Sequence, residues 1–167
     1  MTERTMIRID ARPKLFNFRI AGIALREGHV LVHRATHELF WTFPGGRAEI
    51  GETSEETLRR EIVEELGVEA EIGPLLWTVE NFFHFEKRDY HELGFYYRME
   101  LPARFAFAER GIVHRIVDGP NEIEFMWVRA TPEALAALPL QPDFIAPRIG
   151  DLPERTEHLV WRETVPE

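Results

Sequence analysis

Cysteine is absent from the 167-residue chain, and its absence excludes several kinds of chemistry. Without thiols the protein can form no disulfide bond and no zinc–thiolate site, and it has no thiol nucleophile. Long apolar runs are missing too, because no stretch of about 18 consecutive apolar residues occurs. Residues 1–14 also lack the apolar centre of a secretion signal. We therefore expect a cytoplasmic protein that has no membrane partner.

Positively charged side chains are also few, with 20 Lys and Arg residues against 29 Asp and Glu residues and a net charge of −9. This balance disfavours a polyanion-binding surface, so duplex nucleic acid is not an expected partner. An acidic enzyme can nevertheless bind a small phosphate-bearing molecule when metal ions neutralise its carboxylates. Hydrophobic residues make up 44% of the chain, which is enough for a globular core.

The most informative stretch runs from Gly46 to Val68 and reads GRAEIGETSEETLRREIVEELGV. It predicts a glycine loop followed by an acidic helix. Thr53 or Ser54 can cap the start of this helix, and Gly67 can end it in a left-handed conformation. An apolar stripe with a four-residue spacing predicts the buried face of the helix and comprises Leu58, Ile62 and Leu66.

Three glutamates crowd one side of this helix. Glu61, Glu64 and Glu65 are spaced i, i+3 and i+4, and Glu61 and Glu65 fall at the edge of the apolar stripe. Without a cation, their mutual repulsion would raise their pKa values and weaken the helix. Mg²⁺ prefers oxygen ligands and often shares its site with substrate phosphates, so the cluster predicts a divalent metal site. The simpler alternative is a solvated helix in which Arg60 pairs with Glu64.

A pattern of nine positions favours the metal site. The stretch fits G-x5-E-x7-R-E-U-x-E-E-x-G-U, where U is a bulky aliphatic residue, and it begins within the turn FPGG. The matching residues are Gly46, Glu52, Arg60, Glu61, Ile62, Glu64, Glu65, Gly67 and Val68. On these residues the chain resembles the Nudix hydrolase family, which includes MutT-like proteins. The resemblance covers about residues 18–138 and implies one Nudix domain over residues 1–167, with residues 139–167 as a C-terminal extension.

The order of the expected elements predicts the fold class. Strands interrupted by one long helix, with a second helix late in the chain, indicate an α/β or α+β sandwich. The resemblance implies a Nudix-type α/β/α sandwich with a curved mixed β-sheet. The pattern predicts strands at 18–25, 29–34, 40–43, 91–101 and 122–128, a strand pair within 69–85, an irregular segment at 103–121 and a helix at 131–138. Residues 141–167 are predicted either to add an edge strand or to make an oligomer contact, as in a homodimer.

The resemblance also implies a reaction. Nudix pyrophosphohydrolases use Mg²⁺ or Mn²⁺ to hydrolyse small molecules in which a nucleoside diphosphate is linked to another moiety X. By position in the pattern, Glu61 and Glu65 would be the principal metal ligands, and the backbone carbonyl of Gly45 or Gly46 would join them. Glu64 would contribute to the metal site or orient the attacking water.

Further roles follow from the same resemblance. Glu52 and Arg60, with Gly46, would be structural residues that brace the loop against the helix. Glu122 stands just ahead of a predicted strand, where family members often carry a carboxylate that completes the metal site or acts as general base. Glu124 is the alternate candidate for that role. The simpler interpretation of both is a solvated carboxylate at a sheet edge.

Two residues are candidates for binding substrate. Arg34, at the exit of a predicted strand, suits bidentate contact with a phosphate, although it could simply be a surface residue. Residues 84–90 form a polar and aromatic hairpin tip, a region in which family members often recognise the non-phosphate end of the substrate. Phe85 is the candidate there, and its alternative role is a core aromatic residue.

Other functions on the same fold are weighed against hydrolysis. A non-catalytic Nudix-like domain that senses or binds nucleotides would usually have lost carboxylates that this chain retains. An isopentenyl diphosphate isomerase of this fold would rely on cysteine. The family's proline signature for ADP-ribose and tyrosine signature for diadenosine polyphosphates are replaced here by Phe83 and Phe85. Oxidised nucleotides, nucleotide sugars and capped RNA remain open, and the negative charge disfavours capped RNA.

Overall fold

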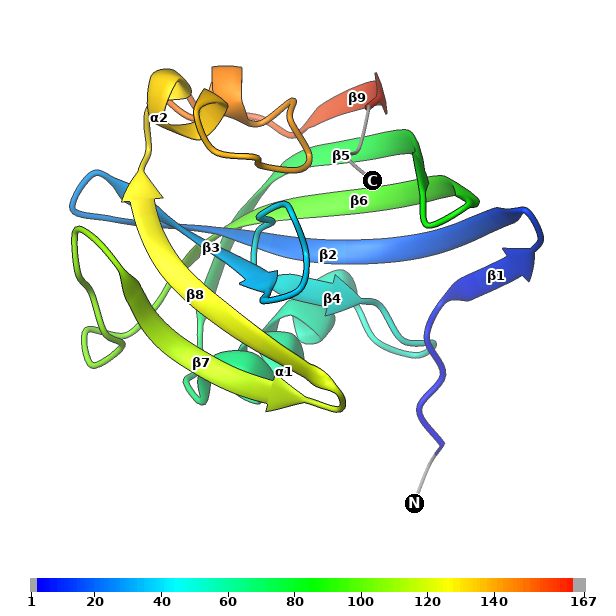
Figure 1. Cartoon of the computed structure of the whole chain (residues 1–167), viewed down its shortest axis with the longest axis horizontal. Coiled ribbons are helices and arrows are strands. Elements are labelled where there is room, and N and C mark those ends of the chain that lie inside the picture. Colours follow the sequence, from blue (N-terminus) through cyan, green and yellow to red (C-terminus); the bar gives the residue numbers. More distant parts are fainter. Residues whose placement is uncertain (1–2, 164–167) are drawn as a thin grey trace.

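The computed structural model describes residues 3–163 and contains a mixed β-sheet whose two halves diverge from one hairpin (Figure 1). Its strands are β1 (Arg8–Ala11), β2 (Lys14–Arg26), β3 (His29–Ala35), β4 (Gly45–Arg47), β5 (Glu71–Phe85), β6 (Arg88–Glu100), β7 (Ile112–Asp118), β8 (Asn121–Arg129) and β9 (Glu157–Arg162). The larger half has the order β2-β6-β5-β9, and the smaller half has the order β3-β8-β7. The pairs β2–β6 and β5–β9 are parallel, whereas the other pairs are antiparallel.

The hairpin between β2 and β3 joins the two halves. The strands pair next to the turn, where Leu25 faces Val30, and then separate. The segment 36–47 enters the opening between them, because β4 pairs with β2 while Thr42 bridges to His33 on β3. This separation leaves room for a binding site between the two halves of the sheet.

Helix α1 (Ser54–Leu66) forms where the sequence predicts it. The hydroxyl of Thr53 accepts a hydrogen bond from the Glu56 N–H at 3.2 Å, and the Glu56 carboxylate accepts one from the Thr53 N–H at 2.7 Å. This capping box satisfies backbone donors that the first turn leaves unpaired. Gly67 ends the helix at φ 67°, in the left-handed region that glycine adopts at least cost.

Two apolar clusters cover the two faces of the sheet. On one face α1 buries its stripe, Leu58, Ile62 and Leu66, against residues of both halves such as Ile20 and Phe125. On the other face, helix α2 (Pro132–Ala136), the 3-10 helix η1 (Ala146–Arg148) and Phe144 pack over Trp77. Helical segments therefore lie on both sides of a curved mixed sheet, which confirms the predicted α/β/α sandwich (Figure 1).

The predicted strand at 40–43 is wrong. In this segment Trp41 and Thr42 make isolated bridges, and the regular strand is β4, which begins at Gly45. The aromatic run therefore crosses the opening between the sheet halves, and the two glycines rather than the aromatic residues pair with β2.

The region after α1 also differs from the prediction. The sequence predicts a strand pair within 69–85, but one continuous strand, β5, forms there, because a bulge near Leu75 accommodates Gly73 and Pro74. The predicted irregular segment at 103–121 contains β7, whose alternation is interrupted by a bulge after Ile112. Strand β1 is an additional element that the pattern does not predict.

The C-terminal extension contributes an edge strand, which is one of the two alternatives predicted for residues 141–167. Strand β9 pairs in parallel with β5 at the margin of the larger half (Figure 1). Residues 1–2 and 164–167 belong to the predicted domain and lie outside the described part of the chain. Within residues 3–163, no helix is long and apolar enough to cross a membrane.

The capping box generates a prediction about stability. Thr53→Ala should lower the free energy of unfolding by about 1 kcal/mol, because it leaves the backbone N–H of Glu56 without its partner. Urea denaturation measures the change, with the exposed Thr5→Ala as the matched control. Equal stability of the two variants would show that the cap contributes nothing.

Candidate active site

The turn between β4 and α1 depends on two glycines. A Cβ on Gly45, whose φ is 153°, would lie 2.0 Å from the carbonyl oxygen of Ile20, so no side chain fits there. A Cβ on Gly46 would lie 2.4 Å from the Glu61 carboxyl carbon. The Glu61 carboxylate therefore lies directly against the backbone of the turn, which only glycine permits.

Arg60 braces the loop against α1. Its Nε and Nη2 donate to the two carboxylate oxygens of Glu52 at 2.7 and 2.9 Å, a bidentate geometry that lowers the pKa of Glu52. Its Nη1 donates to Glu61 at 2.8 Å and to Glu64 at 3.3 Å. The structure thus brings together Glu52 and Arg60, the two residues that the sequence predicts as the brace. Arg60 also pairs with Glu64, as the simpler sequence interpretation expects.

On α1, burial affects the carboxylates of Glu61 and Glu65. Burial raises the pKa of Glu61, and burial followed by the nearby charge of Glu61 raises the pKa of Glu65 well above its usual range. The Oε2 atom of Glu65 is buried and has no hydrogen-bond partner among residues 3–163. Two adjacent desolvated carboxylates repel each other, so a cation beside them would lower the free energy of the folded protein.

The donor set fits a hard divalent cation. Across the described residues 3–163, no group of three or more His, Asp or Glu side chains is arranged so that it could bind one metal ion. Glu61 and Glu64 turn toward Arg60, and Glu64 also accepts a hydrogen bond from Arg4 at 2.7 Å. Glu65 keeps one oxygen unpaired, and the backbone N–H of Gly45 donates to its carboxylate, which opposes the rise in its pKa. Carboxylate and backbone oxygens are the ligands that Mg²⁺ and Mn²⁺ prefer.

A buried histidine lies beside Glu65. Burial, and then the charge of Arg19, lower the pKa of His33 to about 3, so its imidazole is neutral. Its Nδ1 lies 3.7 Å from Glu65 Oε2, which makes this contact a neutral one rather than an ion pair. His33 is 8% exposed, and its ring also packs against Phe125.

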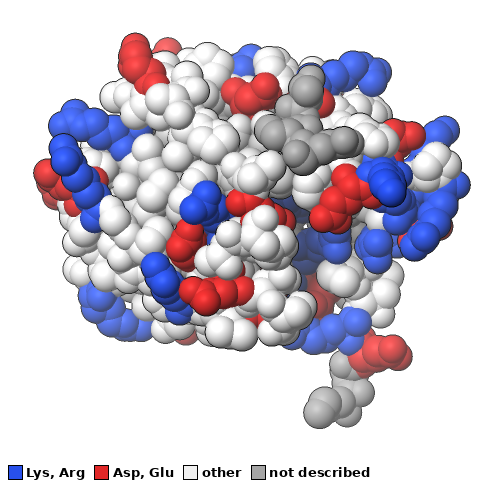
Figure 2. Space-filling model, viewed as in Figure 1, with Lys and Arg blue, Asp and Glu red and all other residues white. Residues whose placement is uncertain are grey.

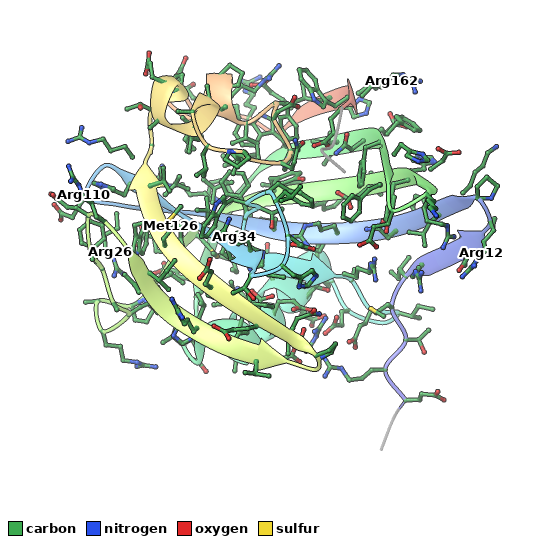
Figure 3. All side chains as sticks on the ribbon, viewed as in Figure 1. Arg12, Arg26, Arg34, Arg110, Met126 and Arg162 are labelled. Carbon is green, nitrogen blue, oxygen red and sulfur yellow. The ribbon has the colours of Figure 1, made fainter. Side chains whose placement is uncertain are left out.

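A cavity of about 310 Å³ opens next to this group of residues. Figure 2 shows a hollow on this face of the molecule with basic side chains at its floor. Both substrate-binding candidates, Arg34 and Phe85, line the cavity. The Arg34 guanidinium, however, donates to Glu124 at 3.0 Å and lies 4.5 Å from the centre of the Trp41 ring. Arg34 lies beside β8 toward the middle of the molecule (Figure 3).

Arg19 is the basic residue of the cavity that the sequence reasoning missed. Its Nη2 donates to the Phe43 carbonyl at 2.8 Å, and its charge affects the pKa values of Glu61 and Glu65. The signal in the sequence was a lone arginine inside the apolar strand FRIAGIAL, where a charge needs a partner.

The hairpin between β7 and β8 carries three carboxylates. Adjacent residues of a strand point to opposite faces, and His114 contacts the Glu65 carbonyl at 2.9 Å, so the face of His114 is the one toward α1. Asp118 lies on this face by alternation, and its charge raises the pKa of Glu65. Glu122 and Glu124 share the opposite face and lie 3.5 and 3.8 Å from Arg115.

The side chain of Glu122 is 47% exposed, whereas that of Glu124 is 10% exposed. The structure does not bring either of them to the carboxylates of α1. The sequence drew attention to Glu122 and overlooked Asp118, because the position of Asp118 depends on β7.

Comparison with known proteins decides the family. The family model described as NUDIX domain matches residues 17–143. The chain belongs to the Nudix family. A MutT-like protein of Streptomyces ambofaciens is 36% identical over 70 residues, which cover 41% of this chain and 46% of that protein. The chain spans about half the length of the first curated relatives that it matches.

Solved Nudix structures share the fold. A UDP-X diphosphatase has a TM-score of 0.59 at 17% identity, with 90% of this chain and 68% of that chain covered. The MutT protein of Bacillus halodurans has a TM-score of 0.57 at 19% identity, with coverage of 85% and 89%. The sandwich described above is therefore the Nudix fold. Nudix hydrolases generally use divalent metal ions, which agrees with the oxygen-rich donor set.

The brace generates the second prediction. Arg60→Ala should lower the free energy of unfolding by about 2 kcal/mol, because it removes the cationic partner of the part-buried carboxylates of Glu52 and Glu61. The matched control is Arg59→Ala, which removes an exposed side chain that pairs with Glu55 at 3.5 Å. Guanidinium denaturation of both variants tests the difference. Similar losses would show that the brace is no stronger than a surface ion pair.

Proposed function

We propose that this Nudix protein hydrolyses the diphosphate of a nucleoside diphosphate linked to another moiety X. The supporting observation is the desolvated pair Glu61 and Glu65, placed beside a cavity that also holds Arg19 and His33. Water would attack one phosphorus and the bridging P–O bond would break, giving two phosphate monoesters, and their formation as dianions would release two protons. The alternative, a non-catalytic nucleotide-binding domain, would have no need for the buried carboxylate pair.

The proposed metal is Mg²⁺ or Mn²⁺. Glu61, Glu65 and a carbonyl of the turn at Gly45 would hold it, and Glu64 would join them or orient the attacking water. Such an ion supplies charge neutralisation of the diphosphate oxygens. Arg60 holds Glu61 and Glu64 in place through its hydrogen bonds, so the brace would position the ligands as well as the loop.

Arg19 is proposed to bind a phosphate oxygen of the substrate, together with Arg34 at the edge of the cavity. Arg19 is anchored by one nitrogen to the Phe43 carbonyl, and the guanidinium has further N–H donors that can point into the cavity. Because Arg34 is engaged with Glu124, a phosphate contact from Arg34 would require that ion pair to open. Arg19 is therefore the stronger candidate.

A carboxylate of the β7–β8 hairpin is proposed as general base. Glu122 stays the candidate from sequence, and Asp118 is added because its side chain lies on the face toward α1. The imidazole of His33 beside Glu65 is neutral. It therefore adds no positive charge that would repel a cation bound by the proposed metal ligands.

The metal mechanism generates the third prediction. Turnover should require Mg²⁺ or Mn²⁺ and cease in chelator, and Glu65→Gln should lower kcat by at least about a hundredfold, or roughly 3 kcal/mol of transition-state stabilisation. Glu55→Gln, an exposed first-turn residue of the same helix, is the matched control. Phosphate release from a panel of nucleoside diphosphate derivatives measures both effects. Full turnover in chelator would exclude the mechanism.

The hairpin generates the fourth prediction. Asp118→Asn should lower kcat by roughly a hundredfold while KM stays within a few-fold, as expected for a group that acts in the transition state. Glu124→Gln should retain most of its activity, since Glu124 faces Arg34 and Arg115. Steady-state kinetics at saturating metal compares these variants with Glu122→Gln. If only Glu122→Gln loses turnover, the hairpin changes its position when substrate binds and Glu122 is the base.

A further inference from the structure

The cavity extends across the larger half of the sheet, away from the metal ligands. Its floor includes Arg19 on β2, Glu92 on β6 and Asn81 on β5, and Glu163 follows β9. Neighbouring strands are about 4.8 Å apart, so the three spacings from β2 to β9 span roughly 14 Å. The cavity can therefore hold a charged group at the Arg19 end and a second, different group at the β9 end.

A buried polar pair closes the β9 end. The side-chain amide of Asn81, which is 2% exposed, donates to Glu163 Oε2. The other two oxygens of the pair, Asn81 Oδ1 and Glu163 Oε1, are buried and have no hydrogen-bond partner within residues 3–163. Buried polar atoms in folded proteins are rarely left in this condition, so the pair points to a ligand that completes it.

The protonation of Glu163 determines which hydrogen bonds the pair can make with a ligand. Burial raises the pKa of Glu163 to about 8, the hydrogen bond from Asn81 opposes this shift, and the charges of Glu92 and Asp143 add to it. At neutral pH the carboxyl group is mostly protonated. Glu163 Oε1 can then donate a hydrogen bond while Asn81 Oδ1 accepts one, so the pair presents one donor beside one acceptor.

The walls of the cavity are aromatic. The rings of Phe83 and Tyr90 stack at 4.7 Å, and Phe40 meets Phe85 edge to face at 5.4 Å. Aromatic faces favour a planar ring system. The edges of nucleobases carry hydrogen-bond donors beside acceptors, as this pair requires. A sugar offers hydroxyl groups in several directions and matches a flat, two-point contact less well.

We propose that Asn81 and Glu163 bind the edge of the substrate's nucleobase and thereby set the base preference of the enzyme. The proposal rests on the hydrolase function proposed above. Glu163 lies outside the matched Nudix segment, which ends at residue 143. The segment that carries β9 would therefore determine which nucleotide is used, while the carboxylates of α1 and the hairpin perform the hydrolysis.

The test uses four nucleoside diphosphate glucoses that differ only in their base, adenine, cytosine, guanine or uracil. The full-length wild-type protein should prefer one base by roughly tenfold or more in kcat/KM. Glu163→Ala and Asn81→Leu should remove this preference with a smaller effect on the poorest substrate. Glu163→Gln should retain it, because glutamine resembles the protonated acid in shape and keeps both a donor and an acceptor.

Glu157→Ala, an exposed glutamate on β9, is the matched control and should leave the base preference unchanged. Equal preference in Glu163→Ala and wild type would overturn the proposal, as would a wild type that discriminates between sugars but not between bases. Loss of preference in Glu163→Gln to the same extent as in Glu163→Ala would overturn the donor–acceptor contact. The thermal midpoint of each variant separates these results from misfolding, and Glu163→Gln provides the comparison if Glu163→Ala is unstable.

A binding measurement separates this proposal from the hydrolase function. Calorimetric titration with the four nucleoside 5′-monophosphates should give base-dependent affinities that Glu163→Ala equalises. Base-selective binding without hydrolysis would support the subsite and exclude the proposed reaction. Hydrolysis of all four glucoses at equal rates would support the reaction and exclude the subsite. If the protein neither binds nor hydrolyses any of these compounds, both proposals are wrong.

Discussion

The close approach of the Glu61 carboxylate to Gly46 is the contact on which the site depends. It requires a residue without Cβ in the turn, a strand pairing that holds the turn against β2 and a helix whose start is set by the cap at Thr53. The contact brings an acidic side chain against the backbone and partly out of water. Together with Glu65 it concentrates negative charge, which Arg60 compensates at Glu61 but which stays uncompensated at the unpaired oxygen of Glu65. The fold thereby holds unfavourable electrostatic energy that a divalent cation would relieve.

The separation of β2 from β3 gives this acidic group its neighbours. Arg19 comes from one half of the sheet and His33 from the other, and both line the same cavity. Burial keeps His33 neutral, whereas Arg19 is a cavity residue whose positive charge acts on Glu61 and Glu65. The opening between the halves thus has negatively charged carboxylates at its α1 end and, next to them, the basic residue Arg19, which is suited to binding a substrate phosphate. An aromatic region follows along β5 and β6.

The sequence predicted those features that depend on neighbours along the chain. The bounds of α1, its cap, its buried stripe and the Glu52–Arg60 brace all follow from spacings of a few residues. Contacts between distant segments could not be predicted in the same way. Arg34 forms a hydrogen bond with Glu124, a residue 90 positions away. Strand β7 places Asp118 on the face toward α1, but the sequence of this strand lacks clear alternation and did not predict it. The pairing of Asn81 with Glu163 depends on a parallel strand, β9, whose partner no local pattern identifies.

The parallel placement of β9 beside β5 has a consequence for how relatives of this protein can diverge. The residues of α1 and the turn lie within the segment shared with the Nudix family, whereas β9 and Glu163 follow it. An exchange or loss of the later segment would reshape one wall of the cavity and leave the acidic helix untouched. If the proposed base contact holds, changes in this later segment would alter which substrate binds while the residues of the acidic helix stay the same.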